Sequence, residues 1–226
     1  MTQALCQLAG DWRGKMPPGG AVIQEKIDGW RAIYIRDITG TPTLFTRNGI
    51  PIEGTGHILH WCEEIERAAG EPLMIDGEFQ VGGTLAATKH WCETGWKQGG
   101  EAGRFHAFDC MTLAEWRSGG TERGQVDRLT MLEHYARAAC ADDWTWRPGS
   151  RGRDERQAPI VIEPWQWAFD GYDVLAAARQ VWLEGREGIM VKQADAPYQR
   201  NRNGHWLKVK VENASKWSAL HREAAA

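Results

Sequence analysis

A lysine, a carboxylate and an arginine lie close together in Lys26-Ile27-Asp28-Gly29-Trp30-Arg31. Lysine is a nucleophile only as the free amine, and nearby positive charge or a metal ion favours that form. The cluster therefore makes Lys26 a candidate nucleophile, with Asp28 and Arg31 beside it. Taken alone, the cluster is explained equally well as a surface hairpin that carries an ion pair.

Two carboxylates flank a glycine in Asp76-Gly77-Glu78-Phe79, inside an apolar segment. Burying both carboxylates costs free energy unless each has a partner, and a metal ion or ligand hydroxyl groups could be those partners. The segment Phe105-His106-Ala107-Phe108-Asp109 adds aromatic rings that could stack on a purine, although core packing is the more common role of such rings.

Two further clusters lie near the C-terminal end, Glu187-Gly188-Ile189-Met190-Val191-Lys192 and Trp206-Leu207-Lys208-Val209-Lys210. On a strand, Lys208 and Lys210 point to the same side, because side chains alternate between the two faces. Two ammonium groups on one face repel each other unless an anion lies between them. A phosphate group is the natural candidate.

The elements expected to position these clusters alternate irregularly along the chain, as hairpins and helices do in α+β proteins with mainly antiparallel sheets. Asp28-Gly29 is a hairpin signal between two of the strands. Helical spacing of apolar residues predicts helices over 56–69, 85–96, 126–139 and 172–183. Strands are expected over 21–27, 31–37, 42–46, 73–80, 104–111, 160–163, 188–192 and 206–211, with a polar loop at 146–159.

In this order, the clusters KxDGxR, DGE, FD, EGxMVK and WLKVK resemble the motif series of the covalent nucleotidyltransferase superfamily, and most closely the adenylation domain of ATP-dependent DNA ligases. Thr46-Arg47-Asn48-Gly49 and the stretch from Tyr198 to Lys210 are similar to further elements of that family, so the resemblance covers about residues 21–211. It implies the ligase-type nucleotidyltransferase fold, which is ATP-grasp-like, with antiparallel sheets flanked by helices.

The resemblance also implies a reaction. Lys26 would attack the α-phosphorus of ATP and keep AMP, the AMP would pass to a DNA 5′-phosphate, and a 3′-hydroxyl would then seal the nick. Lys208 and Lys210 would contact the α-phosphate and stabilise its developing charge. Arg31 and Glu78 would hold the ribose and position the nucleotide.

Base, metal and DNA contacts follow from the same resemblance. Phe108, with Phe105 as the alternative, would stack on adenine. Glu187 would help to place Mg²⁺ or Mn²⁺, with Asp28 as the weaker candidate. Arg47 would touch DNA phosphate. A basic stripe that includes Arg200 and Arg202 could add phosphate contacts, while Lys192 has no assigned role.

The family's usual C-terminal OB-fold domain is not expected in this chain. The nucleotidyltransferase domain is expected over residues 1–211, and the 212–226 tail is too short for a five-stranded barrel. The expected partners are nicked double-stranded DNA and a separate OB-fold protein acting in trans. The compact core resembles a phage gene product, with DNA repair or replication as its setting.

Bulk properties limit the class of protein. The net charge is −3, the five cysteines are widely spaced without a CxxC pair, and no apolar run reaches the length of a membrane helix. A reduced, cytoplasmic, monomeric protein without a signal peptide is therefore expected.

Three other functions remain open. An RNA ligase or a capping-type nucleotidyltransferase would use related chemistry. A catalytically silent nucleotide- or DNA-binding module would bind without covalent transfer. A metal site built from His57, His60 and Cys62 is a weaker alternative, because no fourth ligand is evident.

Overall fold

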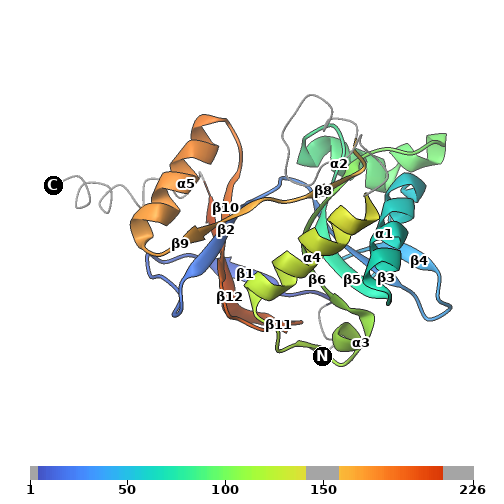
Figure 1. Cartoon of the computed structure of the whole chain (residues 1–226). Coiled ribbons are helices and arrows are strands. Elements are labelled where there is room, and N and C mark those ends of the chain that lie inside the picture. Colours follow the sequence, from blue (N-terminus) through green and yellow to red (C-terminus); the bar gives the residue numbers. More distant parts are fainter. Residues whose placement is uncertain (1–4, 141–157, 211–226) are drawn as a thin grey trace.

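The structure, a computed structural model, describes residues 5–140 and 158–210. The expected tail at 212–226 and most of the expected loop at 146–159 lie outside the described residues. Two five-stranded sheets lie side by side, with helices packed on them (Figure 1). Most neighbouring strands are antiparallel, so the predicted α+β class is confirmed.

The first sheet has the strand order β1-β12-β10-β2-β9. Its only parallel pair is β1 with β12, which brings together residues near the two ends of the described chain. The strands are β1 (Leu8–Asp11), β2 (Ala21–Glu25), β9 (Trp165–Ala168), β10 (Gly188–Gln193) and β12 (Arg202–Lys210).

The second sheet has the order β4-β3-β5-β6-β8, and β6 with β8 is its parallel pair. A two-stranded ribbon of β7 (Gly120–Thr121) and β11 (Tyr198–Gln199) lies apart from both sheets. The strands of the second sheet are β3 (Trp30–Arg36), β4 (Pro42–Thr46), β5 (Leu73–Gln80), β6 (Arg104–Thr112) and β8 (Ile160–Ile162).

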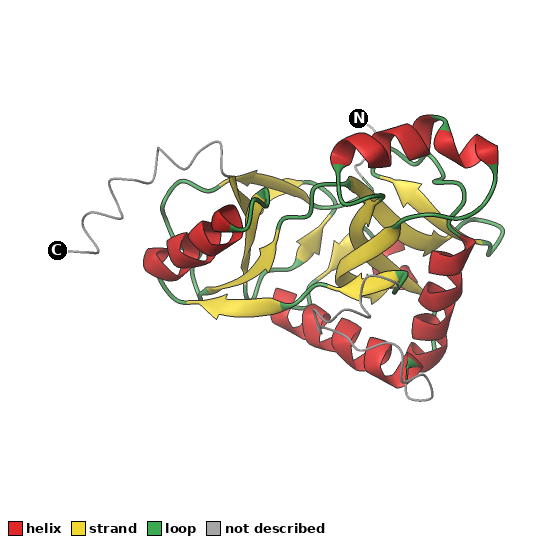
Figure 2. Ribbon diagram, turned by 90° about the horizontal axis from the view of Figure 1, so that it is seen from above, coloured by secondary structure: helices red, strands yellow, loops and turns green. Residues whose placement is uncertain are grey.

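Helices cover the sheets from outside (Figure 2). Helix α5 (Gly171–Leu183) packs on the first sheet, and helices α1 (Gly56–Ala69) and α4 (Gln125–Ala139) pack on the second. Helix α2 (Leu85–Glu93) ends earlier than predicted and is followed by a 3₁₀ turn, η1 (Gly95–Gln98). A short helix, α3 (Leu113–Arg117), follows β6 directly.

Local signals account for the helix ends. The Asp170 carboxylate accepts hydrogen bonds from the backbone N–H groups of Tyr172 and Asp173, which caps α5. Thr84 caps α2 through the N–H of Ala87. Helix α1 ends at Gly70, whose φ of 75° is the left-handed conformation that favours glycine.

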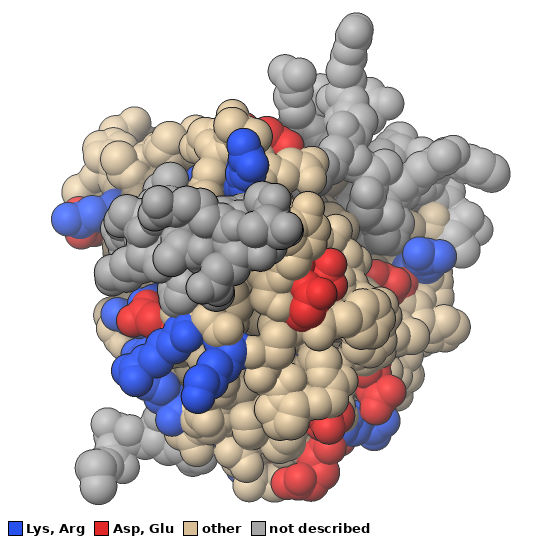
Figure 3. All heavy atoms as spheres, turned by 90° about the vertical axis from the view of Figure 1, so that its left-hand side faces the viewer, with Lys and Arg blue, Asp and Glu red and all other residues tan. Residues whose placement is uncertain are grey.

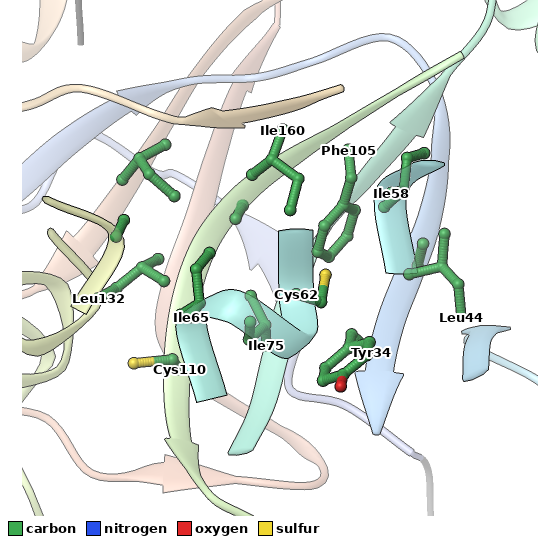
Figure 4. Packing of buried hydrophobic residues seen from close by; sticks show 14 of the residues in the cluster. Tyr34, Leu44, Ile58, Cys62, Ile65, Ile75, Phe105, Cys110, Leu132 and Ile160 are labelled. Atoms are coloured by element: carbon green, nitrogen blue, oxygen red, sulfur yellow. The ribbon is translucent and has the colours of Figure 1, made fainter. Parts of the chain in front are cut away.

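Three apolar clusters hold these layers together. The largest packs α1 and α4 on the second sheet, with Tyr34, Ile58, Phe105 and Leu132 all fully buried (Figure 4). A second cluster joins α5 to the first sheet. The third cluster contains residues of both sheets, so apolar side chains fill the space between the two sheets where this cluster lies.

The expected hairpin at Asp28-Gly29 is wrong. Strand β2 pairs with β10 and β9 in the first sheet, whereas β3 pairs with β4 and β5 in the second. The chain therefore crosses from one sheet to the other between Lys26 and Gly29. Gly29 is required because a Cβ there would lie 2.4 Å from the carbonyl oxygen of Phe79.

Two bulk expectations can be compared with the structure. No described helix combines the length and the apolar character needed to span a bilayer. All five cysteines are free thiols, and four of them are buried while Cys92 is partly exposed.

Candidate active site

Lys26 lies where the chain passes between the two sheets. Its backbone N–H donates to the carbonyl of Gly188 at 2.9 Å, which extends the pairing of β2 with β10 by one residue. Its ammonium group contacts Glu187 Oε2 at 2.6 Å, and Lys210 Nζ lies 2.9 Å from Glu187 Oε1. One carboxylate thus joins two lysines that are far apart in the sequence.

A cavity of about 610 Å³ opens beside Lys26. Its walls come from both sheets and from the turns after β5 and α5, so it lies across the junction of the two sheets. The lining includes Lys26, Asp28, Arg104, His106, Glu163, Arg186 and Glu187. Its charged rim and its size suit a nucleotide.

Arg31 faces the inner side of the second sheet and is engaged by Asp76. Its Nε and Nη2 atoms lie 2.6 and 2.5 Å from the two Asp76 oxygens, and Nη2 also donates to the carbonyl of Gln7. The Tyr198 hydroxyl donates to Asp76 Oδ2 at 2.6 Å. The fully buried Asp76 therefore has the partners that its burial requires, whereas Glu78, two residues on, lines a second and smaller cavity.

Glu78 has no comparable ion pair at hydrogen-bond distance among the described residues. Burial, only partly opposed by the positive charges of Arg31 and Lys26, raises the pKa of the Glu78 carboxyl to about 7. The carboxylate pair predicted from Asp76-Gly77-Glu78 thus divides into one structural group and one group that can meet a ligand.

The two predicted purine-stacking rings do not line the cavity. Phe105 is fully buried in the helix-covered core of the second sheet. Phe108 packs edge-on against Trp206, with Arg31 over its ring at 4.9 Å. The ring that lines the cavity is His106, whose Nδ1 lies 2.8 Å from Glu163 Oε1.

A β-bulge explains this difference. Asp76 pairs with Asp109 and Gly77 pairs with Ala107, so Phe108 is the extra residue of β6. Sequence reasoning singled out neither His106 nor Glu163. The sequence did hold a sign that His106 faces the cavity. In the predicted strand it follows Phe105 directly, and neighbouring side chains of a strand point to opposite faces, so a buried Phe105 places His106 on the other face.

The remaining lysines differ in environment. Lys208 lies 3.4 Å from the exposed carboxylate of Asp11, and it shares a strand face with Lys210 as predicted. Lys192 is buried; its ammonium group donates to the carbonyl of Phe108 at 3.0 Å and lies over the Trp206 ring. Burial lowers the pKa of Lys192 to about 7.

Arg47 belongs to a second cavity, of about 450 Å³, on the other side of the turn that carries Lys26. Trp30, Arg31, Arg47 and Glu78 are among its lining residues, and the Arg47 side chain is exposed. The segment from Lys26 to Arg31 therefore separates two cavities, with Lys26 in one and Arg47 in the other.

Arg200 and Arg202 are partly engaged by the protein. Arg200 lies 4.3 Å above the Trp116 ring and donates to the Trp116 carbonyl, while Arg202 donates to the carbonyl of Ala9.

Basic side chains also gather into one group on the face seen in Figure 3, apart from most acidic ones. The small net charge therefore conceals an uneven distribution.

Metal ligands are sparse. No group of three or more His, Cys, Asp or Glu side chains forms a metal-binding cluster within residues 5–140 and 158–210. The alternative site at His57, His60 and Cys62 is therefore not assembled, and Cys62 is fully buried in the core. Glu187 and the exposed Asp28 both line the large cavity, which fits Mg²⁺ held by one or two carboxylates together with substrate phosphates.

Comparisons with known proteins agree with this geometry. The profile of the ATP dependent DNA ligase domain matches residues 11–210. The ATP-dependent DNA ligase of bacteriophage T7, solved with ATP, superposes with a TM-score of 0.69 and 17% identity, over 92% of this chain and 69% of that one. Chlorella virus DNA ligase-adenylate gives 0.64 and 20%, over 91% and 66%.

A chain described as Pmar-Lig_PreS3 gives a TM-score of 0.70 and 23% identity, over 91% of this chain and 46% of that one. This chain thus spans about half the length of the first solved structures that it matches. None of the curated proteins compared matches the sequence. The profile match covers nearly all of the described chain, which therefore belongs to the ATP-dependent DNA ligase family and has the fold of its nucleotidyltransferase domain.

Proposed function

We propose that the chain is a DNA ligase core that forms a covalent lysyl-AMP on Lys26 and passes the AMP to a DNA 5′-phosphate. The observation that carries this proposal is the meeting of Lys26, Glu187 and Lys210 at the rim of a nucleotide-sized cavity. Every step is a transfer at phosphorus, so positioning and charge neutralisation dominate catalysis.

In the first step the Lys26 amine attacks the α-phosphorus of ATP. A bond forms between Nζ and phosphorus, the bond to the bridging oxygen breaks, and pyrophosphate leaves. The ion pair between Lys26 and Glu187 must open before the attack, and the Lys26 ammonium group must release a proton to solvent to become the free amine. Lys210, freed from Glu187 at the same time, contacts the α-phosphate together with Lys208 and offsets its developing charge.

The bound nucleotide is held by residues of both sheets. Glu78 accepts hydrogen bonds from the ribose hydroxyls, and Arg31 orders this region through Asp76. His106, whose ring lines the cavity, stacks on adenine, with the predicted Phe108 as the alternative. Glu187, with Asp28 as a weaker ligand, would hold Mg²⁺ or Mn²⁺, which would supply positive charge to offset that of the phosphates.

In the second and third steps the AMP moves to DNA. The 5′-phosphate oxygen of a nicked duplex attacks the phosphorus of lysyl-AMP and Lys26 leaves; the 3′-hydroxyl then attacks the 5′-phosphate and AMP leaves. Arg47 contacts the DNA phosphate from the second cavity, which Glu78 also lines, so the acceptor phosphate approaches the turn that carries Lys26 from the side on which Glu78 holds the ribose.

The test is the intact mass of the protein after incubation with ATP and Mg²⁺. We expect a gain of one AMP for the natural chain and none for Lys26→Ala, with the fold of the variant unchanged because Lys26 is not part of an apolar cluster. Lys89→Ala, an exposed lysine of α2, is the matched control and should gain AMP. An adduct that persists in Lys26→Ala would refute the assignment.

An absent adduct in the natural chain would leave two possibilities, which a pre-adenylated nicked duplex separates. Sealing of that duplex would indicate a working core that needs help with the first step, for instance from a separate OB-fold protein. No sealing would indicate a silent binding module. Labelling by GTP in preference to ATP would favour a capping-type enzyme.

A further inference from the structure

Ile50 is an apolar side chain that is 62% exposed, on the turn that follows β4. A single exposed isoleucine is common and indicates no function by itself. Ile50, however, lines the second cavity together with Trp30 and the exposed Arg47. An apolar surface and a cation therefore lie side by side where the proposed function places the acceptor DNA.

The turn that carries Ile50 is closed by hydrogen bonds between its two ends. The backbone N–H of Thr46 donates to the carbonyl of Ile50 at 2.8 Å, and the N–H of Ile50 donates to Thr46 Oγ1 at 3.1 Å. Within the turn, the N–H of Gly49 donates to the Thr46 carbonyl at 2.9 Å. Arg47 and Ile50 are thus held in a fixed relation, so binding a ligand there costs little conformational entropy of the backbone.

Arg47 is the guanidinium group of this cavity that is open to a phosphate, because Arg31 is held by both oxygens of Asp76. A free phosphate would use the cation alone and leave Ile50 and Trp30 uncovered. A nucleic acid strand alternates phosphates with sugars, and proteins contact both. A strand that places a phosphate at Arg47 therefore places a sugar beside it, next to the apolar surface of Ile50.

The chemistry of Ile50 separates the two kinds of sugar. In deoxyribose the 2′ carbon is a methylene group, which packs against aliphatic carbon without losing a hydrogen bond. Ribose carries a hydroxyl group there, and an isoleucine side chain neither donates nor accepts. A hydroxyl that leaves water without finding a partner weakens binding, and the 2′-hydroxyl is the group by which a protein distinguishes RNA from DNA.

We propose that Ile50 packs against a deoxyribose next to the phosphate that Arg47 contacts, and that it selects DNA over RNA in the strand lying in the second cavity. The inference rests on the proposed function only in placing a nicked strand in this cavity. It adds a residue that reads the sugar of the acceptor.

Fluorescence anisotropy of nicked duplexes tests the proposal on the whole chain, without ATP or Mg²⁺ and so without any covalent step. The reference duplex is entirely deoxy, and each of the others has a single ribonucleotide at a different position beside the nick. We expect at least one position at which ribose weakens binding about tenfold, because an unpaired hydroxyl costs about that factor. Binding of every ribonucleotide duplex within about twofold of the reference would overturn the proposal.

The matched variants are Ile50→Ser, whose hydroxyl can pair with a 2′-hydroxyl, and Ile50→Val, which keeps an aliphatic surface. The preference for deoxyribose should fall to within about twofold in Ile50→Ser and persist in Ile50→Val. Ile38→Ser is the control, since Ile38 is fully exposed between β3 and β4 and lines neither cavity. All three positions are exposed, so the fold should be kept. An unchanged preference in Ile50→Ser would refute the role of Ile50.

Failure of the proposed function gives a different result. Selective binding of the deoxy nick without an AMP adduct from ATP would remove the lysyl-AMP chemistry and keep the reading of the sugar. An adduct that forms on a chain binding deoxy and ribose nicks equally well would keep the chemistry and remove the reading of the sugar.

Discussion

Glu187 contacts Lys26 with one oxygen and Lys210 with the other, and the two lysines are separated by most of the chain. The sequence predicted each of them as a site residue through the resemblance to ligases. It could not predict that one carboxylate would join two lysines, because this depends on the pairing of β10 with both β2 and β12.

The aromatic ring that lines the cavity was not predicted. A predicted strand that contains Phe105 and Phe108 favours phenylalanine as the stacking residue, but the bulge in β6 changes which side chains share a face. One extra residue in one strand leaves little trace in the sequence. His106 is found only when the register is known.

A prediction at the scale of single residues concerns Glu78. Its raised pKa of about 7 means that the folded protein holds a proton that the unfolded chain releases near pH 4.5. Stability from this group is therefore fully present below pH 4.5 and is lost as the pH rises to 7. Relative to Glu78→Gln, the natural chain should lose about 2 kcal/mol of unfolding free energy between pH 5 and pH 8.

Urea unfolding of both proteins at the two pH values measures this difference. Glu122→Gln, at an exposed position, is the control and should leave the pH dependence unchanged. A difference between the natural chain and Glu78→Gln that stays constant from pH 5 to pH 8 would contradict the prediction.

At the scale of elements, local periodicity predicted most helices and strands, because their apolar spacing and caps are local properties. The structure has α1, β4 and β5 with the predicted bounds. The sheet that each strand joins was not predictable in the same way. Asp28-Gly29 has the composition of a hairpin turn, but the partners of β2 and β3 are distant strands whose apolar faces must be buried.

Strand β9 was missed altogether, since Trp165-Gln166-Trp167 follows a proline and carries exposed aromatic residues. Its position is set by pairing with β2 at the edge of the first sheet. Helix α3 was also missed because its five residues are too few for a helical period to be recognised, although Thr112 and Glu115 form a capping box.

A prediction at this scale concerns helix α4. Arg128 of α4 is fully buried and forms two hydrogen bonds with Asp109 of β6, while its remaining donors reach two backbone carbonyls and the side-chain oxygen of Gln125. Arg128→Met leaves the Asp109 carboxylate buried without its counter-ion and should cost about 3–5 kcal/mol of unfolding free energy. Arg137→Ala, exposed on the same helix, should cost less than about 0.5 kcal/mol. Both costs are measured by denaturant unfolding. Equal losses of unfolding free energy in Arg128→Met and Arg137→Ala would show that the buried ion pair contributes little to stability.

At the scale of the whole molecule, a net charge of −3 hides basic groups concentrated on parts of the surface. The sequence indicated this unevenness through its C-terminal basic stripe. The sequence did not show that Arg200 stacks on Trp116. Because Arg200 is engaged in this way, the exposed Arg47 and Arg202 are better placed than Arg200 to contact a DNA phosphate.

The corresponding prediction is salt-dependent binding to nicked duplex DNA, measured by fluorescence anisotropy. Affinity should fall steeply between 50 and 200 mM salt, and Arg47→Ala should reduce the logarithmic slope by about one because one phosphate contact is lost. Adenylylation of Arg47→Ala should stay near normal while sealing slows. Arg67→Ala, exposed at the end of α1 on the outer face, is the control. If Arg47→Ala leaves the slope of log affinity against log salt unchanged, the DNA does not contact Arg47.

The parallel pairing of β1 with β12 has a consequence for synthesis on the ribosome. The second sheet and its two helices use residues from Trp30 to Ile162, so they can assemble while the chain is still being made. The first sheet cannot be completed until β12 has emerged and joined both β10 and β1. Lys210 therefore reaches Glu187 and Lys26 last, and a chain that stops short of β12 lacks the ion pair between Lys210 and Glu187.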